Sequence, residues 1–198
     1  MDLVNKSKYN IILGSGSSRR KELLGMTGIN FSVMSIPVDE SFPDSLQGTE
    51  ISEYIVKNKS KAFNKLIKEN EIIITADTLV WFENKCLGKP KDKKEAKYML
   101  KLFAGKSHDV ITSVGFLTTS NFKILTESTT VIYKNLTDSE IDYYVENVNP
   151  IDKAGSYGIQ DWIGMIGVEH VNGSYTSVLG LPVPQTTDQI IKIINENL

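Results

Sequence analysis

The chain has 198 residues, one cysteine and a formal net charge of -2 at pH 7. This length suits one domain with two lobes around a cleft, and we expect residues 1–198 to form it with a core that needs no disulfide. The cysteine, Cys86, excludes an internal disulfide and a multi-cysteine zinc site, and the small net charge argues against a nucleic acid polymer as a partner.

Signals for secretion or membrane insertion are not visible in the sequence. Residues 1–9 are polar and lack the apolar segment of a signal peptide. No stretch approaches the roughly 20 apolar residues of a membrane span. The sequence therefore predicts a cytoplasmic protein without a membrane partner.

Strands and helices alternate in the first half of the chain. A short apolar run predicts a strand before a Gly/Ser segment, and apolar residues at helical spacing predict a long helix further on. The predicted elements are a strand at 9–13, a helix at 18–26 capped by Ser17 or Ser18, a strand at 31–35, a polar loop at 36–48, a helix at 49–70 and an apolar run at 72–82.

The second half is predicted to contain a β-hairpin and further helices. Two capping-box patterns, Asp92-x-x-Glu95 and Thr137-x-x-Glu140, mark helix starts. The predicted elements are a turn at 83–85, a helix to 103, paired strands at 108–119 and 124–133, a helix that ends before Pro150, a small-residue loop at 152–160, strand-like runs at 163–168 and 177–179, and a helix from 185. We therefore expect an α/β fold with a mixed twisted sheet flanked by helices.

The first candidate site is the segment Gly14-Ser15-Gly16-Ser17-Ser18, which is followed by the cations Arg19, Arg20 and Lys21. A helix N-terminus already carries partial positive charge, so cations in its first turn are mildly unfavourable unless an anion binds there. Small residues, free backbone N–H groups and cations together indicate a phosphate site. A solvated helix face is the alternative, and the segment matches neither the Walker A motif nor the dinucleotide fingerprint.

Asp77 is a second candidate because it stands inside the apolar run 72–82. A carboxylate in such surroundings is costly to bury unless it is paired or bound to a metal. It is therefore a candidate metal ligand or general base at the edge of a sheet. The alternative is a turn residue at the end of a strand.

Two lysines are also candidates. Lys59 lies on the edge of the apolar stripe of its predicted helix, so it either extends along the surface to solvent or points into a cleft. Lys89 stands between Gly88 and Pro90, whose backbone preferences define a loop that could direct the ammonium group at a phosphate.

The remaining candidates are loop residues. Asp39 and Glu40 are ordinary loop acids unless they act with Asp77, since carboxylate oxygens suit a Mg²⁺ ion that also binds phosphates. Gln160 ends the small-residue loop and offers both a donor and an acceptor, as recognition of a base edge requires. A plain loop is the alternative there, and we interpret Cys86 as structural.

Taken together, several segments resemble the Maf family of nucleoside triphosphate pyrophosphatases. They are Leu13–Leu24, Thr75–Val80 with Gly88-Lys89-Pro90, Gly105–Val114, Asp152–Gln160 and Gly173–Pro182. The resemblance implies hydrolysis of a nucleoside triphosphate to the monophosphate and pyrophosphate with Mg²⁺ or Mn²⁺. It also implies a fold similar to that of inosine triphosphatase (Maf/Ham1-like), with a cleft between two lobes, and a homodimer.

The resemblance also implies residue roles. Asp77 matches the general base of the family. Arg19, Thr78 and Gln160 match the positions that distinguish its subfamilies, and these residue types are similar to the branch that acts on dTTP and UTP. Other matches to motif positions are Ser15, Glu40, Lys59 and Lys89. The chain departs from the family at Gly14 and Ser18, where Ala and Pro are usual, and at Asp161-Trp162, where Gly is usual.

These roles define a mechanistic hypothesis. Glu40 and Asp77 hold the metal, and Asp77 orients or deprotonates the attacking water. Lys59 and Lys89 neutralise the pyrophosphate leaving group, while Arg19 contacts the substrate.

Other assignments are left open by the sequence. Arg20 and Lys21 are either supporting or solvated. In the mechanistic hypothesis above, Thr78 and Gln160 read the base. The competing functions are a non-catalytic nucleotide-binding regulator of cell division and a phosphohydrolase that releases orthophosphate.

Overall fold

One mixed sheet with helices on both faces forms the fold. The structure is a computed structural model that describes residues 1–196. Its elements are α1 (Asp2–Asn5), β1 (Asn10–Leu13), α2 (Ser18–Gly25), β2 (Phe31–Val33), α3 (Thr49–Lys61), β3 (Glu71–Phe82), β4 (Lys85–Leu87), α4 (Lys93–Phe103), β5 (Ser107–Leu117), β6 (Phe122–Tyr133), α5 (Asp138–Val148), η1 (Pro150–Asp152), η2 (Ala154–Ser156), α6 (Trp162–Gly167), β7 (Val168–Asn172), α7 (Tyr175–Val178) and α8 (Val183–Asn195).

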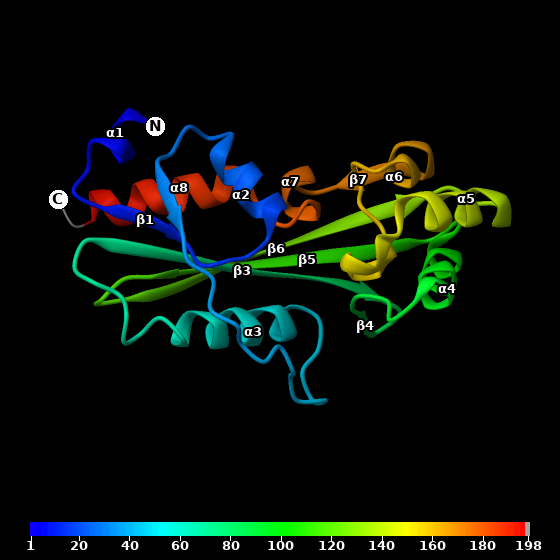
Figure 1. The fold of residues 1–198 in the computed structure, drawn as a ribbon, viewed down its shortest axis with the longest axis horizontal. Helices are drawn as coiled ribbons and strands as arrows, with labels where there is room; N and C mark the ends of the chain where they lie inside the picture. Colours follow the sequence, from blue (N-terminus) through cyan, green and yellow to red (C-terminus); the bar gives the residue numbers. More distant parts are fainter. Residues whose placement is uncertain (197–198) are drawn as a thin grey trace.

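The sheet has the strand order β2-β1-β3-β5-β6-β7, and β4 pairs with β3. β1 is parallel to both β2 and β3, whereas the other pairings are antiparallel. The long strands β3, β5 and β6 run the length of the molecule, with α8 and α2 above one half and α3 below it (Figure 1). The predicted mixed α/β architecture is confirmed.

The middle of β3 has an open edge. β1 pairs with β3 only as far as Ile74, and β4 pairs with it only from Val80 onward. Within residues 1–196, no strand pairs with the stretch between these two residues on that side, although β5 pairs with it on the other. Asp77 and Thr78 lie in this gap, so the topology itself creates a recess at the centre of the sheet.

Side chains of β3 alternate between two cores, as they must in a strand. Ile72, Ile74 and Ala76 pack with residues of α2 and α8 in one hydrophobic cluster. Ile73 and Leu79 point to the opposite face, which α3 covers. Asp77 therefore faces α3 and Thr78 faces away from it.

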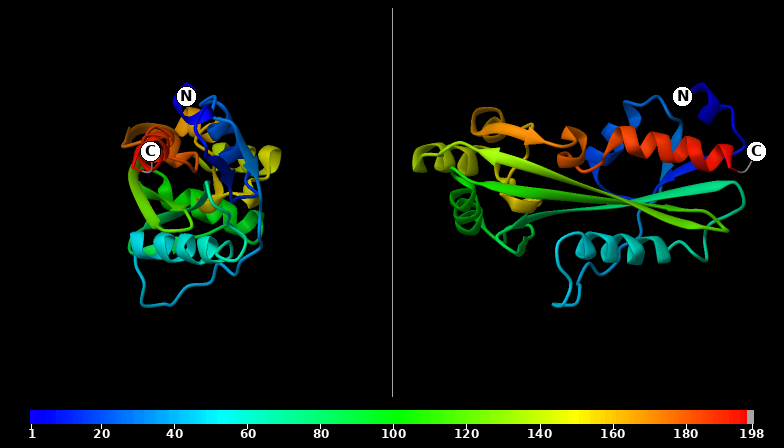
Figure 2. Two further views of the ribbon diagram at one scale, coloured as in Figure 1. Left: turned by 90° about the vertical axis from the view of Figure 1, so that its left-hand side faces the viewer. Right: turned by 180° about the vertical axis from the view of Figure 1, so that it is seen from behind.

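The two ends of the sheet have separate cores. One cluster includes residues of β1, α2 and α8, and another joins α4, α5 and α6 to the far ends of β3, β5 and β6. Figure 2 shows the molecule to be elongated, with these two groups of helices at opposite ends of the same strands. No helix among the described residues is long and apolar enough to cross a membrane.

Three sequence-based element predictions were wrong. The helix predicted at 49–70 ends at Lys61, and successive turns follow in which the Phe63 N–H donates to the Ser60 carbonyl. Phe63 lies in this turn and still packs in the core. Its spacing from the apolar residues of α3 therefore did not indicate that the helix continues. Tertiary packing, rather than helix propensity, ends α3 here.

The strand-like runs at 163–168 and 177–179 are also not strands. They fall mainly in α6 and in α7 with the residues after it, and the strand of this region is β7, between them. Short apolar runs do not distinguish strands from helices by periodicity. Ser174, which caps α7 by accepting from the Ser177 N–H, was the available helix signal.

Close contact between α3 and the sheet depends on small residues. Buried hydrogen bonds join Ser52 to Ser113 at 2.7 Å and Ser60 to Thr75 at 2.6 Å. A Cβ added to Gly115 would lie 2.7 Å from Val56 Cγ1. This close approach brings the α3 side chains to the centre of β3.

Gly115→Ala should therefore destabilise the protein by about 1–3 kcal/mol, because overpacking forces α3 away from the sheet. Gly25→Ala is the matched control, since a Cβ there meets nothing within 4 Å. It should cause no loss and a gain of at most about 1 kcal/mol. Urea unfolding measures both changes, and equal stability of the two variants would contradict this packing account.

Candidate active site

A cavity of about 550 Å³ lies at the open edge of β3. Its volume is in the range of small-molecule sites. Its charged lining consists of four cations, Arg19, Arg20, Lys59 and Lys89, and three acids, Glu40, Asp77 and Asp152. All eight residues that the sequence marked as site residues line it, namely Ser15, Arg19, Glu40, Lys59, Asp77, Thr78, Lys89 and Gln160.

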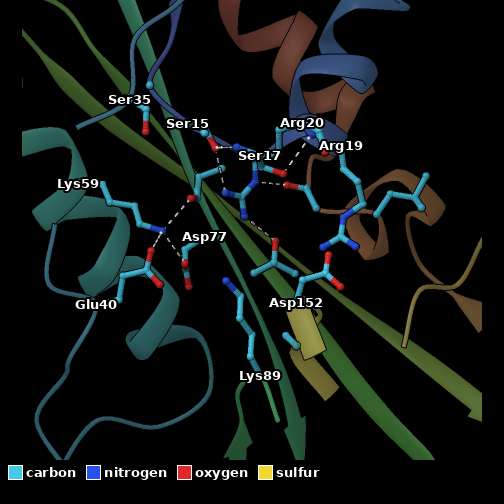
Figure 3. Close-up of a pocket in the computed structure, with 18 of the residues that line it drawn as sticks. Ser15, Ser17, Arg19, Arg20, Ser35, Glu40, Lys59, Asp77, Lys89 and Asp152 are labelled. Carbon is cyan, nitrogen blue, oxygen red and sulfur yellow. Dashed lines mark hydrogen bonds and ion pairs between the residues drawn. The ribbon is translucent and has the colours of Figure 1, made fainter. Parts of the chain in front are cut away.

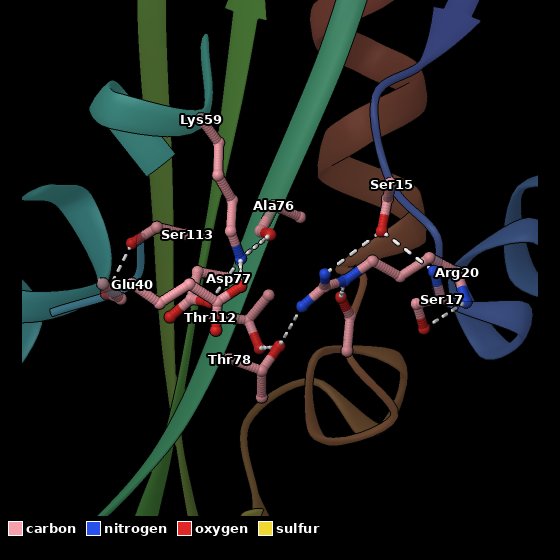
Figure 4. Close-up of polar contacts among 12 residues, drawn as sticks. Ser15, Ser17, Arg20, Glu40, Lys59, Ala76, Asp77, Thr78, Thr112 and Ser113 are labelled. Atoms are coloured by element: carbon pink, nitrogen blue, oxygen red, sulfur yellow. Dashed lines mark hydrogen bonds and ion pairs between the residues drawn. The ribbon is translucent and has the colours of Figure 1, made fainter. Parts of the chain in front are cut away.

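Lys59 links the two acidic candidates. Its Nζ donates to Asp77 Oδ1 at 2.8 Å and lies 2.8 Å from Glu40 Oε1 (Figure 4). It also donates to the Ala76 carbonyl at 3.4 Å. The Lys59 and Asp77 side chains are only 15% and 11% exposed. Lys59 therefore points into the cavity, and the alternative in which it extends to solvent is wrong.

Nearby cations keep Glu40 ionised, and Asp77 keeps one oxygen free. Partial burial acts to raise the pKa of Glu40, but the hydrogen bond and charge of Lys59, with smaller contributions from Lys89 and Arg20, hold this pKa below its usual value. Glu40 is therefore ionised at neutral pH. Asp77 Oδ2 makes no hydrogen bond within residues 1–196, so it faces the cavity as a free acceptor.

Asp39 does not join this pair. Its carboxylate accepts hydrogen bonds from the Ser41 N–H at 2.9 Å and from the Ser41 hydroxyl at 2.7 Å. These bonds hold the pKa of Asp39 below its usual value. Asp39 does not line the cavity, so it is an ordinary loop acid.

The Gly/Ser segment forms one wall of the cavity and the start of α2. Ser17 is the helix cap and accepts from the Arg20 N–H. Ser15 Oγ accepts from the Ser17 N–H at 3.3 Å and from Arg20 Nη1 at 3.3 Å, which leaves its hydroxyl hydrogen available to a ligand. At Gly14 a Cβ would lie 3.0 Å from both Phe63 and Thr75, which explains the absence of a larger residue here.

Arg20, not only Arg19, belongs to the site. Its guanidinium donates to the Gly180 carbonyl at 2.9 Å, to Ser15 and to Thr78 Oγ1 at 3.1 Å. Burial lowers the pKa of Arg20, an effect that Asp77 opposes, and the group remains charged at neutral pH. Of the two roles left open by the sequence, Arg20 has the supporting one.

A directed chain of hydrogen bonds starts at Arg20. Arg20 donates to Thr78, whose hydroxyl lies 3.0 Å from the Thr112 hydroxyl, and Thr112 donates to the Ser177 carbonyl at 2.8 Å. Because the Thr112 hydrogen goes to Ser177, Thr78 must donate to Thr112. Thr78 therefore presents only an acceptor lone pair to a ligand.

Two further cations, Arg19 and Lys89, offer charge to a ligand. Figure 3 shows Arg19 next to Asp152 on one side of the cavity and Lys89 rising from below, while Glu40, Lys59 and Asp77 lie on the other side. The side chains of Arg19 and Lys89 make no hydrogen bond or ion pair within residues 1–196. These two cations are therefore free to bind an anion.

Some cavity residues were missed from the sequence. Gly180 belongs to a segment that carries the family resemblance, but its role, accepting from Arg20, was not predictable without the fold. Ser35 and neighbouring residues after β2 also line the cavity. Cys86 is a half-buried free thiol, and burial together with Asp77 raises its pKa to about 11, in agreement with a structural role.

A divalent metal fits the acidic pair. Lys59 Nζ contacts Glu40 and Asp77 at 2.8 Å each, so the two carboxylates lie close enough together to bind one further cation through their other oxygens. Mg²⁺ is often held by one or two carboxylates together with substrate phosphates. The described residues contain no cluster of three or more metal-binding side chains, so such a metal would depend on the substrate for its other ligands.

Known proteins resemble this chain over almost its whole length. The family described as Maf-like protein matches residues 10–193. Relatives named dTTP/UTP pyrophosphatase include one from Bacteroides fragilis, 48% identical over 91% of this chain and 94% of its own. Others are from Bacteroides thetaiotaomicron, 44% identical over 96% and 100%, and Flavobacterium johnsoniae, 43% identical over 94% and 96%.

Among solved structures, the Staphylococcus aureus Ham1 protein is similar with a TM-score of 0.44 and 11% identity. The similarity covers 64% of this chain and 72% of that one. A similarity at this level carries no conclusion about function.

Lys59→Met should raise the pKa of Glu40, because the cation that stabilises its carboxylate is lost. In the wild type, the Lys59–Glu40 pair stabilises the folded protein at pH values above the ordinary glutamate pKa. This stabilisation is lost as the pH falls through the lower pKa that Glu40 has in the folded protein. NMR titration of the Glu40 carboxyl measures the shift. Lys57→Met, an exposed lysine of the same helix, is the control, and an unchanged Glu40 titration in Lys59→Met would refute the pairing.

Arg20→Lys should destabilise the protein by about 2 kcal/mol, since an ammonium group cannot replace the three contacts of the guanidinium. Arg19→Lys is the matched control in the same helix turn and should leave stability within about 0.5 kcal/mol. Urea unfolding compares the two. Equal stabilities would mean that Arg20 does not tie the loops together.

Proposed function

The chain belongs to the Maf-like protein family, and on this premise we propose that it hydrolyses dTTP and UTP to the nucleoside monophosphate and pyrophosphate. The single observation that carries the proposal is the convergence of all eight family-matched residues on one cavity. Relatives 43–48% identical to the chain carry the name dTTP/UTP pyrophosphatase, which supports the same substrates.

The phosphates would bind between the Gly/Ser wall and the free cations. Ser15 has a hydroxyl hydrogen to donate, and the start of α2 adds the partial positive charge of its N-terminus. Lys89 is a free cation in the same cavity. It would neutralise the charge that develops on pyrophosphate as it leaves, which is the main protein contribution in phosphoryl transfer.

Asp77 would act as the general base on water. Lys59 occupies Oδ1 and so orients the carboxylate, which leaves Oδ2 to accept the proton of the attacking water. Glu40 and Asp77 would hold a divalent cation, which when bound supplies charge stabilisation at the reacting phosphate. Lys59 would keep Asp77 oriented and, from the same place, add positive charge for the pyrophosphate leaving group.

The base would bind at the other side of the cavity. Thr78 presents an acceptor lone pair, which complements the N3–H of thymine and uracil and is mismatched with the unprotonated N3 of cytosine. Gln160 has a free amide that can both donate and accept. Arg19, which lies next to Asp152 in Figure 3, would contact the nucleoside or its adjacent phosphate.

The two competing functions make different demands on the site. A nucleotide-binding regulator of division has no need of an oriented free carboxylate at the position of Asp77 Oδ2, and this feature favours the enzyme. A phosphohydrolase of another type would release orthophosphate instead of pyrophosphate. The homodimer and the cytoplasmic location stay predictions.

Product identification with the purified protein tests the proposal. The protein with Mg²⁺ or Mn²⁺ should release pyrophosphate from dTTP and UTP faster than from other common nucleoside triphosphates. Release of orthophosphate, or binding without turnover, would overturn it.

Asp77→Asn should lower turnover by about 10²- to 10⁴-fold while the melting temperature changes little, because the amide cannot accept the proton. Asp39→Asn is the matched control, since this nearby acid lies outside the cavity. Steady-state kinetics measures both. Near-full activity of Asp77→Asn in the presence of metal would show that the assignment of the base is wrong.

A further inference from the structure

The orientation of Gln160 depends on the backbone that carries it. Its side chain is exposed in the cavity and makes no hydrogen bond within residues 1–196. Ile159 before it is buried, and Asp161 after it is half buried. An amide that is to discriminate between bases must be held in position before the base arrives. The support for Gln160 therefore has to come from its neighbours.

The neighbours form a closed turn around Gln160. The Asp161 N–H donates to the Gly158 carbonyl at 2.9 Å, so residues 158–161 make a four-residue turn with Gln160 at its third position. The Tyr144 hydroxyl of α5 donates to Asp161 Oδ2 at 2.7 Å and accepts from the Gly158 N–H at 3.3 Å. One hydroxyl group thus holds both ends of the turn.

Burial fixes the position of the Tyr144 ring and keeps its hydroxyl protonated. It is fully buried in the core that α4, α5 and α6 share, so its ring cannot move independently of the helices. Burial, with the hydrogen bond to Asp161, raises the pKa of the Tyr144 hydroxyl. The hydroxyl therefore stays protonated and remains a donor to the carboxylate.

Asp161 does not make the side-chain hydrogen bond that is usual at its position. It is the N-cap residue of α6, where an aspartate normally accepts hydrogen bonds from the first turn of its helix. Its side chain makes no such bond. The carboxylate turns instead to Tyr144, with Lys153 Nζ at 3.8 Å from the same oxygen. A contribution to helix stability is thus given up in favour of a contact with the turn.

Other contacts anchor the first part of the loop. The Gly155 N–H donates to the Gly88 carbonyl at 3.0 Å, and the Tyr157 hydroxyl lies 2.6 Å from His108 Nε2. These contacts do not involve Tyr144 or Asp161. Loss of the Tyr144 hydroxyl would therefore loosen the turn at 158–161 and leave the rest of the loop in place.

We infer that Tyr144 and Asp161 are positioning residues that hold Gln160 for base recognition and so determine base selectivity without touching the substrate. Neither residue lines the cavity. The inference rests on the proposed function. Because Asp77 and Lys59 are held by β3 and α3, the chemical step should be insensitive to this turn.

Tyr144→Phe tests the inference by removing one hydroxyl group. For the preferred nucleotide, KM should rise on the order of fivefold to tenfold with kcat within about twofold. The preference over the other common nucleoside triphosphates should fall by the same factor. Asp161→Ala should behave likewise, and Asp161→Asn, which keeps an acceptor oxygen for Tyr144, should restore part of the selectivity.

Tyr143→Phe is the matched control. Tyr143 is the preceding residue of the same helix, is 54% exposed and packs against Trp162 with ring centroids 4.8 Å apart. Its hydroxyl has no hydrogen-bond partner among the described residues, so KM, kcat and selectivity should match the wild type. Hydrogen exchange at the Gly158 and Asp161 amides should accelerate in Tyr144→Phe but not in Tyr143→Phe, while exchange in β3 stays unchanged in both.

Two outcomes would overturn the inference. One is faster exchange at the turn with unchanged KM and selectivity in Tyr144→Phe and Asp161→Ala. The other is an equal loss of kcat for every nucleotide. If the wild type releases no pyrophosphate, only the proposed function is overturned. The ratio of the Kd values for different nucleotides, compared between the wild type and these variants, would still test whether the turn determines base selectivity.

Discussion

The contact of one ammonium group with two carboxylates is the interaction on which the site depends. Lys59 reaches Asp77 and Glu40 at 2.8 Å each from a helix that small residues hold close to the sheet. Asp77 is nearly buried, and an unpaired carboxylate there would be costly. The contact with Lys59 gives the Asp77 carboxylate a partner at the centre of the sheet and leaves one of its oxygens free.

The open edge of β3 makes the centre of the sheet accessible to a ligand that has phosphates at one end and a base at the other. Because side chains of a strand alternate between its faces, Asp77 faces α3 and Thr78 faces the loop before α8. A cavity at an open edge reaches both faces at once. On our proposal, the general base and a base-recognition residue are thus adjacent in one strand, and Arg20 connects the second of them to Ser15 before α2.

The site was more predictable from the sequence than some of the elements around it. Asp77 stood out because a charge inside an apolar run demands a partner, and the Gly/Ser segment because cations follow a helix start. The sequence could not show which distant residues contact each other. The hydrogen bond from Arg20 to the Gly180 carbonyl, for example, joins residues 160 positions apart in the chain. The end of α3 and the helices α6 and α7 were mispredicted because core packing, not local periodicity, determines them.

On our proposal, one cavity at the edge of β3 separates phosphate binding from base recognition, with Asp77 between them. A crystal structure of the Asp77→Asn variant with dTTP and Mg²⁺ tests it most directly. We predict the terminal phosphates beside Ser15 and Lys89, the α-phosphate next to residue 77, and thymine at Thr78 and Gln160. The reverse orientation, with the base on the Gly/Ser wall and phosphates at Gln160, would show that this division of the cavity is wrong.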